Sequence, residues 1–99
     1  MNLKAYVVVD SLERQVIEEV QKAMASLGVS FHFSPTRNQD TLNQCTEFYA
    51  TTNCKKEDFD CLIPQLNSYW EIGEDYYQDY GFNTKMFHSH VYFLSIEKI

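Results

Sequence analysis

The chain has little glycine and proline, with three glycines and two prolines among its 99 residues. No segment therefore has the composition of a flexible or proline-rich linker, and no internal repeat is visible. A chain of this length normally makes one domain, so we expect a single domain over residues 1–99. Hydrophobic residues make up 44% of the chain and aromatic residues 15%, which excludes an intrinsically disordered protein.

The sequence also lacks a long apolar run. No stretch approaches the roughly 18 apolar residues of a membrane-spanning helix, and MNLKAYVVVD at the N-terminus does not read as a signal peptide. The three cysteines, Cys45, Cys54 and Cys61, form no CxxC pair. An odd number of cysteines without a secretion signal is typical of reduced thiols, so we expect a cytoplasmic protein. We expect Cys61 to be buried near the apolar side of a helix.

Basic residues are scarce, because eight Lys and Arg stand against fourteen Asp and Glu, for a net charge of −6. Such a chain is repelled by nucleic acid and by anionic membranes, so we expect direct binding to neither. An acidic surface prefers a basic partner. A net charge of this size also serves simply to keep a small domain in solution, and composition alone leaves both interpretations open.

The first part of the chain predicts a strand and a helix. Apolar residues alternate over Leu3 to Val9, which is typical of a strand. Asp10 and Glu13 have the spacing of a capping box, and Gly28 stands where a helix would end. The expected buried stripe of this helix consists of Leu12, Val16, Ile17, Val20, Met24 and Leu27.

Three more strands and a second helix are expected in the rest of the chain. Residues 29–34 and 47–52 alternate as strands, with a polar connection between them that suggests a hairpin. A long strand is expected over residues 85–96. Between them lies a helix with Pro64 on its solvent side. The apolar stripe of that helix consists of Phe59, Leu62, Ile63, Leu66 and Trp70.

This β-α-β-β-α-β order predicts an α+β fold of the ferredoxin-like type, with a four-stranded antiparallel sheet and two helices on one face. The other face of the sheet is then open to solvent, covered by a second subunit or used for binding. The fold class alone does not identify a function. The side chains expected on the open face are Tyr6, His32, Tyr49, His88, His90 and Tyr92.

The three histidines on that face form one candidate site. His88 and His90 would lie about 6–7 Å apart along a strand, and His32 could supply a third ligand for Zn²⁺. Histidine also suits half-exposed sheet surfaces and dimer interfaces. Because no carboxylate or cysteine accompanies the three imidazoles, we expect no metal and no cofactor.

The same histidines support an enzymatic alternative. His32-Phe33-Ser34 and His88-Ser89-His90 resemble the paired H-x-S/T strands of the two-histidine phosphoesterases. The resemblance implies that both imidazoles act as general acid and base on a phosphate ester. It covers six positions, and His90 stands where the pattern has a hydroxyl. Our main expectation is that the protein is not an enzyme.

Residues 69–82, YWEIGEDYYQDYGF, contain four carboxylates, six aromatic rings and no basic residue. Tyrosine and tryptophan are enriched at binding hot spots, and surrounding carboxylates steer a basic partner. A short helix here would place two of the tyrosines on one side. In the structural alternative, Trp70, Ile72 and Phe82 enter the core while the tyrosines cover the second helix. The predicted partner-binding residues are Trp70, Glu71, Glu74, Asp75, Tyr76, Tyr77, Asp79 and Tyr80, with Glu47, Glu57, Asp58 and Asp60 as an acidic extension.

These features favour a small acidic protein-binding inhibitor, of the immunity-protein or phage-inhibitor type. Its expected partner is a basic, nucleic-acid-handling protein such as a nuclease, whose Lys and Arg side chains would pair with the carboxylates. The alternatives are a phosphoesterase-type or metal-binding site on the sheet face, and a ferredoxin-like homodimer that packs through the open sheet face around a small-ligand site.

Overall fold

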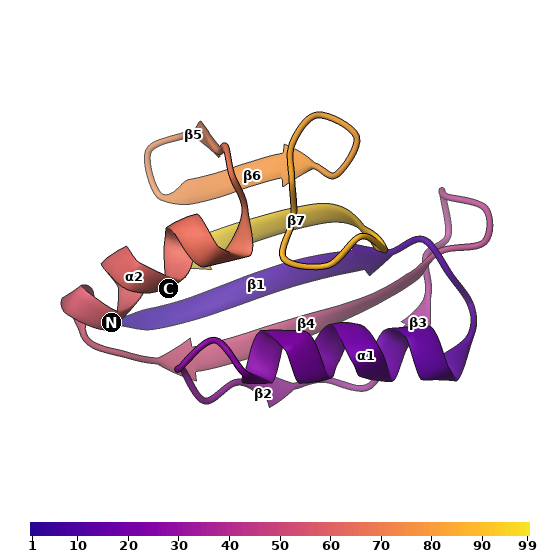
Figure 1. The fold of residues 1–99 in the computed structure, drawn as a ribbon, viewed down its shortest axis with the longest axis horizontal. Helices are drawn as coiled ribbons and strands as arrows, with labels where there is room; N and C mark the ends of the chain where they lie inside the picture. Colours follow the sequence, from indigo (N-terminus) through magenta and orange to yellow (C-terminus); the bar gives the residue numbers. More distant parts are fainter.

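The computed structural model describes all 99 residues and has an α+β fold with one antiparallel sheet. The helices α1 (Arg14–Ala25) and α2 (Lys56–Leu66) lie on one face of the sheet and contribute to a single hydrophobic core. The two ends of the chain meet, since the backbone N–H of Ile99 donates to the carbonyl of Asn2 at 3.0 Å (Figure 1).

The sheet has seven strands in the order β2-β4-β1-β7-β6-β5, and β3 pairs with β4 beside β2. The predicted α+β class is confirmed, but the predicted four-stranded sheet is wrong. The expected long strand after the second helix is preceded by a hairpin that continues the sheet beyond β7 (Figure 1). The strands are β1 (Asn2–Val9), β2 (His32–Phe33), β3 (Arg37–Asn38), β4 (Thr46–Asn53), β5 (Glu71–Ile72), β6 (Tyr76–Tyr80) and β7 (Val91–Lys98).

The strands β1 and β4 form as their alternation predicts. Leu3, Ala5 and Val7 are buried against the helices, while Tyr6 points to the opposite face and lies directly across from Tyr49 of β4. The expected strand over residues 29–34 is shortened to the two residues of β2.

The helix α1 begins later than the capping box predicts. Its N-cap is Glu13, whose side chain makes no capping hydrogen bond, and the N–H of Glu13 is instead satisfied by Ser11 Oγ at 3.0 Å. The predicted capping box is wrong. The side chain of Asp10 does not cap the helix but pairs with His90. The helix ends at Ala25, and Gly28 adopts a positive φ of 89° in the turn that follows.

The helix α2 keeps Pro64 in its last turn, where the ring is exposed as predicted. Cys61 is also exposed, so the prediction that it is buried is wrong. Trp70 lies beyond the end of the helix but still joins the core, and its indole Nε1 donates to the carbonyl of Ile63 at 2.9 Å.

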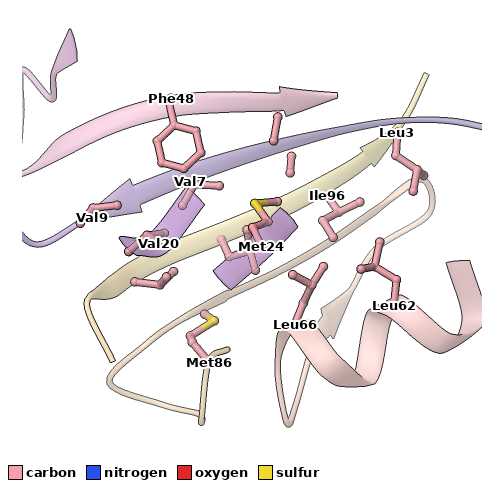
Figure 2. Packing of buried hydrophobic residues seen from close by; sticks show 14 of the residues in the cluster. Leu3, Val7, Val9, Val20, Met24, Phe48, Leu62, Leu66, Met86 and Ile96 are labelled. Atoms are coloured by element: carbon pink, nitrogen blue, oxygen red, sulfur yellow. The ribbon is translucent and has the colours of Figure 1, made fainter. Parts of the chain in front are cut away.

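The core lies between the sheet and the two helices, and Figure 2 shows its side chains pointing toward one another. Val20 and Met24 of α1 and Leu62 and Leu66 of α2 are fully buried against it. Met86 enters the same core from the loop before β7 (Figure 2). The helical spacing on α1 and α2 thus determines which side of each helix meets the sheet.

The last strand differs from its prediction in both position and register. It begins at Val91 rather than Lys85, so residues 85–90 form a loop. A β-bulge opposite Val8 and Val9 shifts the pairing, because Val8 pairs with Phe93 and Val9 with Val91. The rings of Tyr92 and Phe93 consequently share the open face, whereas simple alternation assigns Phe93 to the core.

Candidate functional site

Residues 69–82 form most of a β-hairpin, so the short helix that was one possibility around the tyrosines does not form. Glu71 pairs with Gln78 and Ile72 with Tyr77, and β6 in turn pairs along its length with β7. A Cβ at position 73 of the connecting turn would collide with the ring of Tyr76, so the exposed side chain of Tyr76 would have to move. In this extended backbone the side chains alternate between the two faces of the sheet.

Two of the predicted binding residues, Tyr77 and Trp70, pack the hairpin against α2. Tyr77 packs edge-on against Phe59 of α2 and against Trp70, with ring centroids 5.6 Å and 6.0 Å apart. Trp70 is only 9% exposed. Both rings therefore serve the fold, and neither is presented to a partner.

A third predicted residue, Asp79, is buried one position before the end of the strand β6. Its Oδ1 accepts a hydrogen bond from the backbone N–H of Tyr80 at 2.7 Å and from Asn83 Nδ2 at 3.3 Å. A carboxylate that is 6% exposed and occupied in this way is a structural group.

The remaining predicted residues of the hairpin are exposed, and the segment carries most of the protein's exposed large apolar side chains. Five of the eight such side chains lie in residues 69–82. We use the term hairpin surface for the exposed carboxylates and rings of the hairpin. The hairpin surface consists of Glu71, Glu74, Asp75, Tyr76, Tyr80 and Phe82.

A continuous run of aromatic rings connects the hairpin surface to the middle of the open sheet face. The ring centroids of Tyr49 and Tyr6 are 5.3 Å apart, and those of Tyr6 and Phe93 are 6.1 Å apart. Phe93 lies 4.7 Å from Tyr80, and Tyr80 stacks on Phe82 at 5.2 Å. Four strands thus contribute to one apolar band that the helices do not cover.

The predicted acidic extension divides into two groups. Glu57, Asp58 and Asp60 are exposed on α2, where Asp60 pairs with Lys56 at 2.9 Å. Glu47 is instead buried on β4, so it adds nothing to an acidic surface.

The carboxylate of Glu47 has two partners on the open face. Arg37 Nε donates to its Oε2 at 2.6 Å, and the hydroxyl of Tyr6 donates to its Oε1 at 3.0 Å. Burial, together with the carboxylate of Glu47, raises the pKa of Tyr6, and the hydrogen bond to Glu47 raises the pKa of Arg37.

The candidate histidine site on the sheet face is not formed. His88 and His90 lie in the loop before β7, where His90 Nδ1 is 2.6 Å from Asp10 Oδ1 and His88 Nε2 is 3.9 Å from Glu19 Oε2. His32 lies on β2 at the edge of the sheet. No three His, Cys, Asp or Glu side chains gather as a metal site would require. The two-strand histidine pattern of the phosphoesterases is therefore absent.

Three exposed or half-exposed apolar side chains, Ile72, Phe82 and Phe93, were not among the predicted binding residues. Ile72 is 66% exposed and Phe82 is 71% exposed, although the structural alternative placed both in the core. Gly73 lies between two runs of apolar and acidic residues, which is a sequence signal for a hairpin. Strand alternation in that hairpin places Tyr76 and Tyr80 on one face. No comparable feature of the sequence predicts the β-bulge that places Phe93 on the open face.

Comparison with protein-family models, curated proteins and solved structures finds no match to this chain. Neither helix is long and apolar enough to cross a membrane. The candidate functional site is therefore the hairpin surface together with the open sheet face.

Proposed function

We propose that this chain is a small acidic inhibitor that acts in the cytoplasm, binds a basic, nucleic-acid-handling protein through the hairpin surface, and occludes that protein. The observation that carries the proposal is the composition of the exposed hairpin. It combines the carboxylates of Glu71, Glu74 and Asp75 with five exposed large apolar side chains, and no Lys or Arg occurs between positions 69 and 84. Such a surface suits an inhibitor of the immunity-protein or phage-inhibitor type, because its charge complements a basic partner.

The chemistry of that surface suits a groove that grips phosphate. Lys and Arg side chains that bind nucleic-acid phosphates form charge-assisted hydrogen bonds equally well with carboxylates. The rings of Tyr76, Tyr80 and Phe82 supply a rigid apolar area beside them, which is the usual character of a binding hot spot. Electrostatic attraction between the two surfaces would raise the association rate and favour basic partners over others.

The rigidity of the hairpin supports the same proposal. Tyr77 and Trp70 pack it against α2, and β6 pairs with β7 over five residues. A surface that is already ordered loses little conformational entropy on binding, which favours affinity.

We also infer that the sheet order β2-β4-β1-β7, with the two helices on one face, is a ferredoxin-like unit. Residues 67–90 between α2 and β7 then form an insertion that carries the hairpin surface. This arrangement supports a division in which the unit provides the scaffold and the insertion provides the binding site.

The test is affinity capture with the wild-type protein and a Glu71→Lys/Asp75→Lys variant, followed by mass spectrometry and binding measurements on the purified partner. Both positions are exposed, so we expect the variant to fold and its affinity to fall by tenfold or more, about 1.4 kcal/mol. Glu13→Lys/Asp40→Lys is the matched control, because it makes the same change in charge at exposed positions outside the hairpin surface.

Support requires three results together. The captured protein must be basic and bind nucleic acid, the wild-type chain must inhibit it, and only the hairpin variant must lose binding. A partner that both variants bind equally well would contradict the proposal, as would a partner whose activity is unchanged in the complex.

The aromatic run favours a second candidate, a homodimer that packs through the open sheet faces. Tyr6, Tyr49 and Phe93 lie in the middle of that face and would be buried between two copies. Light scattering after size-exclusion chromatography tests this candidate. A dimer that Tyr49→Lys converts to a monomer would support it, and a wild-type monomer at high concentration would exclude it.

A further inference from the structure

The largest hollow on the protein lies away from the hairpin, between α1 and the segment that contains β2 and β3. Its volume is about 640 Å³, within the usual range of about 300–1,000 Å³ for small-molecule sites. Only a minority of its lining residues are hydrophobic, so the hollow suits a polar ligand.

Both arginines of the chain line this hollow. Arg14 comes from α1 and Arg37 from β3, and the other six cationic side chains of the sequence are lysines at other places. The lining contains one carboxylate, Glu18, which pairs with Arg14, and the carboxylate of Glu47 pairs with Arg37 from outside the lining.

Each guanidinium keeps its terminal nitrogens free for a ligand. Arg14 donates from Nε to Glu18 at 3.2 Å, and Arg37 donates from Nε to Glu47 at 2.6 Å. An arginine held through Nε still presents the N–H groups of both terminal nitrogens. The buried Glu47 thus holds the guanidinium of Arg37, while Arg14 forms an exposed ion pair with Glu18, and both arginines keep their outer donors free.

Neutral polar side chains complete the hollow. Gln21 of α1 and Thr36 and Asn38 of the facing segment line it, and none of the three uses its side chain in a hydrogen bond within the protein. Amides and hydroxyls can donate to the oxygens of an anion beside the arginines. Each of these side chains can therefore add a donor beside those of the arginines.

We propose that this hollow binds a small molecule through a phosphate or carboxylate group, with Arg14 and Arg37 as the principal contacts. Guanidinium groups match the oxygens of such anions in planar, paired hydrogen bonds, which lysine cannot reproduce. The site is separate from the hairpin surface and does not depend on the inhibitor function.

The test is a titration of the ¹⁵N-labelled protein with inorganic phosphate and, separately, with acetate, at an ionic strength held constant with sodium chloride. We expect saturable amide shifts confined to residues 12–21 and 33–38. In Arg14→Gln the affinity should fall about tenfold, because a charge-assisted contact is lost. Lys22→Gln is the matched control, since it removes one exposed positive charge from the same helix outside the hollow.

Arg37→Lys provides the second variant, because it retains a charge beside Glu47 while removing the forked donor, and it should also weaken binding. Saturation by phosphate alone would indicate that the ligand of the hollow is a phosphate ester. Saturation by both anions would indicate a ligand with a carboxylate, or with both groups. Shifts that do not saturate, or that Arg14→Gln and Lys22→Gln reduce equally, would overturn the proposal as non-specific attraction.

Discussion

The hydroxyl of Tyr6 donates a hydrogen bond of 3.0 Å to the carboxylate of Glu47, a residue that is only 5% exposed. A buried carboxylate is costly unless its oxygens have partners. Tyr6 satisfies one oxygen and Arg37 the other, so β1, β3 and β4 meet at one charged group on the open face.

Removal of this hydroxyl should destabilise the protein. In Tyr6→Phe one oxygen of a buried carboxylate loses its donor, so we expect the free energy of unfolding to fall by about 1–2 kcal/mol at pH 7. Urea unfolding followed by circular dichroism measures the change. Tyr69→Phe is the control, because Tyr69 is 66% exposed and should be neutral.

The same pair predicts a pH dependence. Burial, and then the carboxylate of Glu47, raises the pKa of Tyr6 above its ordinary value of 10.0. A raised folded-state pKa contributes stability that is fully present below about pH 10 and is lost as the pH rises through the folded-state pKa. The stability difference between wild type and Tyr6→Phe should therefore shrink above pH 10. A difference that grows with pH would contradict this assignment.

The two sides of the hairpin should respond differently to truncation. Tyr77→Ala removes a ring packed between Phe59 and Trp70, so we expect a loss of about 2–4 kcal/mol in stability. Phe82→Ser removes a ring that is 71% exposed, so stability should change by less than about 0.5 kcal/mol while partner binding weakens. Thermal unfolding and partner affinity, measured on both variants, separate the two roles.

Asp79 should behave as a structural residue although it lies in the acidic segment. In Asp79→Ala the backbone N–H of Tyr80 and the amide of Asn83 both lose their acceptor, so we expect a loss of about 1–2 kcal/mol. Hydrogen exchange of the amides in residues 79–83 should quicken. An Asp79→Ala variant with unchanged stability and lost partner binding would instead make Asp79 a contact residue.

The three cysteines should differ in reactivity. Burial raises the pKa of Cys45 and Cys54, while Cys61 is exposed on α2. Because the thiolate is the reactive form, we expect a maleimide to modify one thiol rapidly in the native protein. Cys61→Ser should abolish the fast phase, and denaturant should expose the other two thiols. Rapid labelling of all three native thiols would contradict the described burial.

Elements with a regular local pattern can be predicted from the sequence alone. Alternation predicted β1 and β4 within one residue at each end, and helical spacing identified the buried stripe of α1 from Ile17 to Met24. These patterns predict the structure well because each such element buries one face against the core. Burial of one face requires apolar residues at a regular spacing within the element itself.

The burial and contacts of the acidic, aromatic segment and of the histidines depend on the tertiary structure. The pairing of β6 with β7 makes residues 76–80 a strand, buries Asp79, packs Tyr77 against the core and leaves Tyr76 and Tyr80 exposed. A bulge in β7 moved Phe93 to the open face, and the late start of that strand put His90 beside Asp10. Strand partners and register come from residues far apart in the chain, so no local period in the sequence contains them.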